Sequence, residues 1–443
     1  MKQILNIIFS SNHRLSNILL AAIYSLVYDY MYENFVYKLF YYIGRLDYEP
    51  MTLERGIIWI LLSSLPFAEY KGINKISSFF SLFLYLFVYI PFIHAMMVLY
   101  NISDMRTYTY SLAMFIFIIL FFKAGNEWTP IKNIIIKPQL PFKTIEILTI
   151  ILTIAFVGIA HKHMHFVNIF TDSSQLYELR SENSESESLG GIGYLQGWLF
   201  GAFYPFVLVH YLDHKKWLKV AMALFGYILL FMVDMQKMTF LMPFALIILY
   251  QIIRINEQKI SYYLHSYIMI AIICFSCLVY IFQDNELIFT IAAILLLRTV
   301  CVAGWLTQLY VHFFNENPYT YYSHINIINF ITQDYPYSVP LGKAVAYGSQ
   351  NANANFFLTD GIAAGGIVGI CIIGIFFLAL LIFINSITAR YKKTDMFVLF
   401  MPTIAFFLNT SIFTTMLSNG LLPLILIVAC TNINNNKKEI QVK

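Results

Sequence analysis

Long apolar stretches separated by short polar ones make up most of the chain. Many of them reach the roughly 20 residues that an apolar helix needs to cross a bilayer. Hydropathy places twelve such spans, near 16–36, 52–68, 78–99, 108–123, 145–161, 194–212, 219–234, 238–253, 262–282, 361–386, 396–411 and 413–431. The pattern predicts an all-α, polytopic membrane protein of about twelve transmembrane helices, with residues 1–443 forming a single integral membrane domain.

The composition excludes a water-soluble globular protein. Apolar residues make up 59% of the chain and charged residues only 12%, whereas soluble domains carry about 25% charged residues. The basic residues indicate how the spans are oriented. With the N-terminus in the cytoplasm, 19 of the 28 lysines and arginines fall in inner segments, which agrees with the positive-inside rule. We therefore expect both termini to be cytoplasmic.

Residues 286–314, ELIFTIAAILLLRTVCVAGWLTQLYVHFF, would form a thirteenth span with Arg298 at its centre. Burying that guanidinium would cost about 2.5–3.5 kcal/mol or more. The extra crossing would also move six basic residues to the outer face. We therefore predict interfacial or re-entrant helices here, within a large outer loop at about 283–360. A shorter outer loop covers about 162–193, and these two loops form the predicted active site.

Two arginines in these loops are candidate phosphate ligands, Arg298 and Arg180. A guanidinium is always charged, and its planar fork of donors suits phosphate oxygens. Each also has a simpler interpretation, because Arg180 has glutamates beside it and Arg298 could reach lipid phosphates. Lys237, on a tight outer turn in VDMQKMTF, is either a third cation for the same ligand or an ordinary turn lysine.

The large outer loop is rich in side chains that suit a sugar. Its tyrosines include Tyr319 and Tyr322, and aromatic faces can pack on the apolar faces of sugars. Interfacial tyrosines are also common in membrane proteins of every kind. His324 is the candidate to accept or orient a hydroxyl proton, because the pKa of histidine lies near neutrality. A purely structural histidine is the alternative.

The stretch GSQNANANFFLTDGIAAGGIVG closes this loop. If it is extended, alternate amides project to one side, where they could bond sugar hydroxyls: Asn351, Asn353 and Asn355. A helix is expected to begin near Asp360, because a carboxylate is favourable at the positive helix end. Glycines then recur every four residues and would let a neighbouring helix approach closely, at Gly361, Gly365 and Gly369.

No pattern in the chain indicates a metal or a cofactor. The histidines of HKHMH at 161–165 have no carboxylate or cysteine beside them, and all five cysteines lie in apolar sequence. We therefore expect neither a metal ion nor a cofactor.

The motifs above resemble those of the Wzy-type O-antigen polymerases, also called oligosaccharide repeat unit polymerases. NANANFFLTDGIAAGGIVG is similar to that family's asparagine–alanine–asparagine segment before an apolar run. LLLRTVCVAGWLTQLYVHFFNENPYTYYSHINI resembles its arginine, FF, NP and SH block. The spacing of Arg180 and Gly191 and the lysine-led span QKMTFLMPFALIIL are also similar. The resemblance is best over about 230–370.

The resemblance implies a metal-independent, GT-C-like glycosyltransferase in the bacterial inner membrane. Such an enzyme moves a growing glycan from undecaprenyl diphosphate onto the next lipid-linked repeat unit at the periplasmic face, making O-antigen or capsule-type polysaccharide. Arg298 and Arg180 would stabilise the leaving diphosphate, and His324, or else Asp334 or Asp360, would deprotonate the acceptor hydroxyl. The implied partners are the lipid-linked oligosaccharide as donor and acceptor, membrane lipids, and a chain-length regulator and a flippase as further candidates, but no nucleic acid.

Two other functions remain open from the sequence. An O-antigen ligase has a similar layout and the same donor, but attaches the glycan to lipid A–core. A repeat-unit flippase would transport the glycan without chemistry, and would carry ionisable groups deep in its spans. Asp29 is the main ionisable residue inside a predicted span here.

Overall fold

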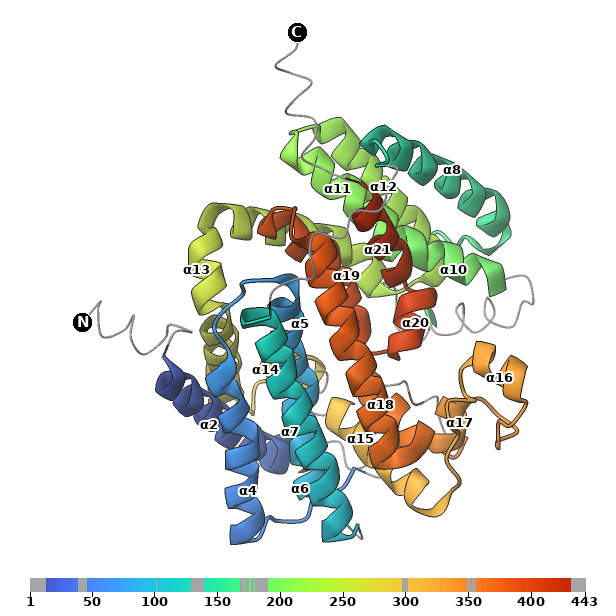
Figure 1. Ribbon diagram of the computed structural model, residues 1–443. Coiled ribbons are helices and arrows are strands. Elements are labelled where there is room, and N and C mark those ends of the chain that lie inside the picture. The colour runs from blue at the N-terminus through green and yellow to red at the C-terminus, as the bar shows by residue number, and fades with distance from the viewer. Residues whose placement is uncertain are drawn as a thin grey trace. The chain divides into compact units, whose positions relative to one another are not determined.

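The described part of the chain is all-helical, as its computed structural model shows (Figure 1). The structure describes residues 13–38, 46–100, 102–128, 139–167, 171, 175–176, 179, 190–296, 302–348, 352 and 356–431. Seven helices among these residues are long and apolar enough to cross a membrane: Ile76–Met97, Asp104–Asn126, Phe142–His163, Gly191–Asp213, Trp217–Asp234, Lys237–Ile281 and Leu358–Thr388. The prediction of an all-helical protein is confirmed, and these seven helices have the length and composition of membrane spans.

Helix α13 (Lys237–Ile281) contains two of the predicted spans, 238–253 and 262–282. It runs for 45 residues and is broken only at Asn256, whose φ and ψ are −133° and 36°. A straight helix of that length would extend about 68 Å, roughly twice the hydrocarbon thickness of a bilayer. The polar sequence RINEQK, which separates the two predicted spans, is helical on both sides of Asn256 because Arg, Glu, Gln and Lys are good helix formers.

Four other predicted spans correspond to shorter or interrupted helices. α2 (Arg14–Met31) continues into the π-helix η1 (Tyr32–Tyr37), and α4 (Leu53–Ser64) into the 3-10 helix η3 (Leu65–Glu69). α19 (Lys393–Phe407) has 15 residues. Gly420, with φ +89°, separates α20 (Ile412–Leu417) from α21 (Leu421–Cys430). The residues at these breaks do not lower the apolar content of the predicted spans, so hydropathy does not reveal the breaks.

The chain divides into two compact units, each assembled from separate stretches of sequence. Unit 1 comprises Met1–Thr129, Gln258–Ile382 and Phe407–Ile412. Unit 2 comprises Pro130–Glu257, Phe383–Phe406 and Phe413–Lys443. The predicted outer loop 283–360 belongs entirely to unit 1.

Unit 1 packs around a nearly fully buried segment, α5 (Ile76–Leu84), η4 (Tyr85–Tyr89) and α6 (Ile90–Met97). α7 (Asp104–Asn126) packs against α5, and α15 (Val302–Glu316) against α6. This unit also contains α2, α4, the part of α13 from Gln258 on, α14 (Glu286–Leu296), α16 (Asn326–Thr332), α17 (Leu341–Val345) and most of α18 (Phe356–Thr388).

Helix α15 is largely buried within unit 1. Ten of its 15 residues are buried. A Cβ on Gly304 would be 3.3 Å from the carbonyl oxygen of Pro91, so the backbones of α15 and α6 approach closely.

Unit 2 contains α8 (Phe142–Ala160), the 3-10 helix η5 (His161–His163), α10 (Gly190–Trp198), the π-helix η7 (Leu199–Phe203), α11 (Tyr204–Asp213) and α12 (Trp217–Asp234). The turn between α20 and α21 packs directly on α10 and η7. A Cβ on Gly197 would lie 1.9 Å from the carbonyl oxygen of Ser418, and the Trp198 indole donates to the carbonyl oxygen of Leu417 at 2.8 Å. One isolated β-bridge, between Leu140 and Thr431, is the sole β pairing in the described residues.

Candidate active site at the break in helix α18

Helix α18 is broken in its first third, at Gly365 and Gly366. Gly366 has φ +58° and ψ −127°, a conformation open almost exclusively to glycine. A Cβ on Gly366 would also lie 2.6 Å from the hydroxyl oxygen of Tyr110 and 2.8 Å from that of Tyr319. Glycine is therefore required here both for the backbone angle and for the two tyrosines that contact it.

The glycine repeat of α18 lets the helix fold back on itself. A Cβ on Gly361 would be 2.7 Å from the Cα of Ile370, and one on Gly369 would be 2.1 Å from the carbonyl oxygen of Gly361. Residues nine positions apart on a straight helix are about 13 Å apart. We predicted that these glycines let a neighbouring helix approach, but the close approach at Gly361 and Gly369 is between two parts of α18, and Gly365 has no such contact. The helix also begins at Phe356, one turn before the predicted start at Asp360.

The break frees backbone carbonyls, and the loop after α15 satisfies them. The amide of Thr320 donates to the carbonyl oxygen of Ala363 at 2.8 Å, and the amide of Tyr321 to that of Ala364 at 3.0 Å. In an unbroken helix these carbonyls would accept from residues four positions on. The loop that leads to His324 is therefore fixed on α18 by backbone hydrogen bonds.

His324 faces Asp360 across this junction. The Nε2 of His324 lies 3.7 Å from the Oδ1 of Asp360, and the two side chains are only 9% and 3% exposed. The hydroxyl of Thr320 donates to the carbonyl oxygen of Ala363 at 3.0 Å, so it accepts from His324 Nδ1 at 2.8 Å. The proton of the neutral ring is thereby assigned to Nδ1. Nε2 keeps its lone pair and has no hydrogen-bond partner among the described residues.

Asp360 is held from its other side by residues 411 and 412. Its Oδ2 accepts a hydrogen bond from the backbone amide of Ile412 at 3.3 Å, and the hydroxyl of Ser411 also bonds the carboxylate. We expected Asp360 to sit at the start of its own helix, but it contacts the first residue of α20 instead. These donors fix the carboxylate with Oδ1 toward His324.

Two of the predicted sugar-binding tyrosines belong to the same junction. The hydroxyl of Tyr322 donates to the carbonyl oxygen of Gly369 at 2.9 Å. Burial, followed by the negative charge of Asp360, raises the pKa of Tyr322 to about 12, so this phenol stays protonated at neutral pH. Tyr319 stacks on Phe314, with 5.9 Å between ring centroids. Both rings are partly exposed and line the fold of α18.

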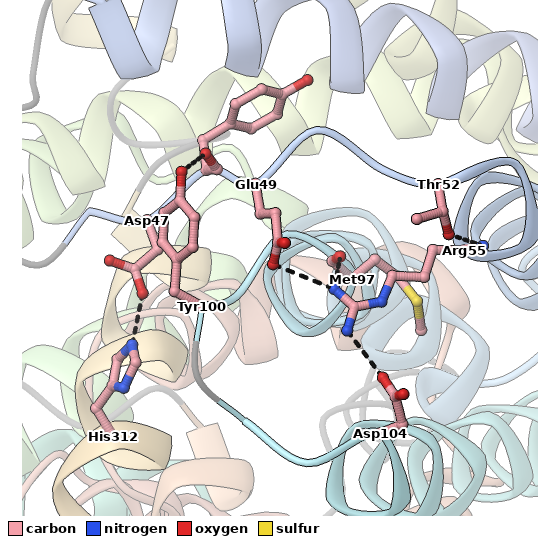
Figure 2. Close-up of polar contacts among 9 residues, drawn as sticks. Asp47, Glu49, Thr52, Arg55, Met97, Tyr100, Asp104 and His312 are labelled. Atoms are coloured by element: carbon pink, nitrogen blue, oxygen red, sulfur yellow. Dashed lines mark hydrogen bonds and ion pairs between the residues drawn. The ribbon is translucent and has the colours of Figure 1, made fainter.

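A second acid–histidine pair connects α15 to the segment before α4 (Figure 2). The Nε2 of His312 lies 2.5 Å from the Oδ2 of Asp47. The buried amide of Gln308 donates to the carbonyl oxygen of Asp47 at 3.0 Å and accepts from its backbone N–H at 3.2 Å. These contacts fix α15, the helix that leads into the His324 loop.

Arg55 is already paired within unit 1 (Figure 2). Its guanidinium lies 2.8 Å from an oxygen of Asp104 and 3.6 Å from one of Glu49, and it donates to the carbonyl oxygen of Met97 at 3.4 Å. The carboxylates of Asp104 and Glu49 balance its charge, so Arg55 is a structural arginine and a poor candidate for a phosphate ligand.

Four of the nine predicted site residues meet at the α18 junction: His324, Asp360, Tyr319 and Tyr322. Four others lie outside the described residues, and their roles stay predictions: Arg298, Arg180, Asn351 and Asn353. Lys237 begins α13, belongs to unit 2 and is exposed.

Sequence reasoning missed three residues at this junction, Thr320, Tyr110 and Arg106. Thr320 orients His324, and Tyr110 contacts Gly366. Arg106, one helical turn before Tyr110, donates to the Oδ1 of Asn315 at 2.7 Å. Thr320 and His324 are four residues apart, which is a weak signal, and nothing in the sequence connects α7 with α18.

The described residues include no group of three or more His, Cys, Asp or Glu side chains able to hold a metal ion. No family model, curated protein or solved structure matches this chain.

Proposed function

We propose that this protein is a membrane glycosyltransferase that polymerises lipid-linked oligosaccharide repeat units at the outer face of the bacterial inner membrane. The observation that supports it is the buried, oriented pair of His324 and Asp360 beside the broken helix α18. This proposal includes a GT-C-like arrangement of twelve spans with both termini in the cytoplasm.

The chemistry proposed for the pair is removal of a proton from the acceptor sugar. The lone pair on His324 Nε2 takes the hydroxyl proton while that oxygen forms a bond to the anomeric carbon of the donor. The bond from the anomeric carbon to the diphosphate oxygen breaks, and undecaprenyl diphosphate leaves. Asp360, whose carboxylate faces the same nitrogen, stabilises the imidazolium that forms by its negative charge.

The leaving group carries additional negative charge in the transition state. In the proposal, Arg298 and Arg180 stabilise that charge, with Lys237 as a further cation. Removing one such donor from an active site typically costs about 2.7–4 kcal/mol of transition-state stabilisation. Asn351, Asn353, Tyr319 and Tyr322 hold the sugars.

One observation favours the transporter alternative. Asp29 and His94 lie in predicted spans, with 2.8 Å between the Oδ1 of Asp29 and the Nε2 of His94. The rings of Tyr28, Tyr32 and Trp59 surround His94. An ionisable pair at membrane depth is a feature of proton relays and transport sites.

The deciding experiment gives the purified protein, in lipid nanodiscs, an undecaprenyl-diphosphate-linked repeat unit. A ladder of lengthening glycans, lost in His324→Asn, is the expected result. If instead the protein in liposomes moves the lipid-linked glycan across the bilayer and forms no ladder, the transporter alternative replaces this proposal.

A further inference from the structure

An apolar groove of about 520 Å³ lies within unit 2, between α8, α11 and α12. Its walls include Ile150, Ile154, Val207, Met222 and Phe225. Volumes of 300–1,000 Å³ are typical of ligand pockets. The groove is thus large enough to hold a ligand, and its walls require that ligand to be apolar over most of its length.

Tyr204 and Gly226 both line the groove, and Tyr204 packs against α12 at this glycine. A Cβ on Gly226 would lie 2.6 Å from the ring of Tyr204, which occupies that space. The hydroxyls of Tyr204 and Thr153 bond each other at 3.0 Å, and Thr153 also donates to the carbonyl oxygen of Thr149. The hydroxyls of Tyr204 and Thr153 are therefore hydrogen-bonded within the protein, so a ligand in the groove needs no polar group to pair with them.

The helices on both sides of the groove present apolar side chains outward. Ile154 on α8 is 67% exposed, and Leu218 on α12 is 80% exposed. Both helices are among the seven that can cross a membrane. Such surfaces face hydrocarbon in a bilayer, so a lipid chain can enter the groove from the side.

One end of the groove is charged. Glu146 pairs with Lys219 and accepts a hydrogen bond from the hydroxyl of Tyr211 at 2.8 Å. The neighbouring lysines Lys215 and Lys216 are exposed. Three lysines against one glutamate give this end a net positive charge.

The adjacent carboxylate of Asp213 does not cancel that charge. It binds the ammonium group of Lys392, at 2.8 and 3.0 Å. The exposed indole of Trp217 beside the lysines is of the type found at membrane–water interfaces.

We propose that this groove binds an anionic phospholipid, with one acyl chain between α8 and α12 and its phosphate on Lys215, Lys216 and Lys219. The predicted orientation places these lysines on the cytoplasmic side, where anionic lipids attract basic residues near spans by about 1 kcal/mol each. This binding is independent of the proposed glycan transfer.

The test is native mass spectrometry of the delipidated full-length protein with phosphatidylglycerol or phosphatidylcholine of the same chains. We expect the protein to retain one phosphatidylglycerol molecule tightly and to bind phosphatidylcholine more weakly. The double variant Lys215→Gln, Lys216→Gln keeps the Lys219–Glu146 pair, and should weaken phosphatidylglycerol binding by about fivefold per lysine. Lys259→Gln, which removes an exposed lysine from the kink of α13, is the matched control and should bind normally.

A second pair of variants tests the acyl chain. Ala221→Trp fills the groove from its rim, where Ala221 is exposed, and should abolish tight binding. Ile228→Trp, at an exposed position of the same helix outside the groove, should not. Equal retention of the two lipids by the wild type, or unchanged phosphatidylglycerol binding by Ala221→Trp, would overturn the proposal.

Discussion

The imidazole of His324 and the carboxylate of Asp360 face each other at 3.7 Å, farther apart than a hydrogen bond allows. An oxygen about 2.8 Å from both atoms would complete a triangle with them. In the proposed reaction, the oxygen of the acceptor hydroxyl would take this position. Both partners are fixed from behind, His324 by Thr320 and Asp360 by Ile412.

His324→Asn keeps a donor that can reach Thr320 but removes the basic Nε2. Because general base catalysis typically contributes 10²–10⁴-fold, the rate of glycan extension should fall by about that factor. The measurement is the ladder assay in nanodiscs. His161→Asn, at an exposed histidine of η5, is the control and should extend chains normally. Unchanged extension by His324→Asn would remove this histidine from the chemistry.

Arg298→Ala tests the predicted diphosphate ligand. The variant should insert into the membrane in normal amount and yet make no long chains, because the charge of the leaving group is no longer balanced. A glycan gel from cells that express only the variant gives the readout. Chains of normal length would exclude Arg298 from the mechanism.

Gly366→Ala should destabilise the protein, since alanine would adopt φ +58° and its Cβ would meet the hydroxyl of Tyr110 at 2.6 Å. A residue held in such a backbone region costs about 1–3 kcal/mol. The expected result is a lower melting temperature of the detergent-solubilised protein.

The neighbouring glycine supplies the control. Gly365 has φ 177°, which any residue adopts, and a Cβ there would have no atom within 4 Å. Gly365→Ala should therefore melt close to wild type. Equal melting temperatures for the two variants would show that the break does not depend on glycine at 366.

The stability of unit 2 should depend on pH through Asp395, which is 1% exposed. Burial raises the pKa of its carboxyl from 3.8 to about 6, although the charge of Lys392 opposes the shift. Between pH 4 and 6 the folded state binds more protons than the unfolded state, so stability falls as pH rises. The shift corresponds to at most about 3 kcal/mol.

Asp395→Asn removes the ionisable group. Its melting temperature should exceed that of the wild type at pH 8, and the difference should shrink toward pH 4.5. Asp284→Asn, which removes an exposed carboxylate, is the matched control. A variant less stable than wild type at pH 8 would contradict the prediction.

Hydropathy located the long apolar helices of this fold but not how they are divided. The kink at Asn256 and the left-handed Gly420 are single-residue features, and apolar content does not encode them. Gly366 shows the same limit. The repeat of Gly361, Gly365 and Gly369 predicted close packing with a neighbouring helix, but only the backbone angles reveal that α18 breaks at Gly366 and packs on itself.

Residue chemistry predicted part of the candidate site. His324 and Asp360 were selected separately, one as a base near neutrality and one as a helix-start carboxylate, and the structure brings them together. Their pairing could not be predicted, because it depends on the fold of α18. The Asp47–His312 pair is even harder to predict from the sequence, since 265 residues separate its members along the chain.

The discontinuity of unit 1 has a consequence for biosynthesis. Gln308 and His312 can bond Asp47 only after they have been synthesised. Residues 130–257, which belong to unit 2, lie between them and Asp47 and are made first. At roughly 5–20 residues per second, that delay is on the order of ten seconds. During this time the first helices of the chain lack α15, which packs against α6 in the finished fold. The incompletely packed helices are then accessible to insertion factors and proteases.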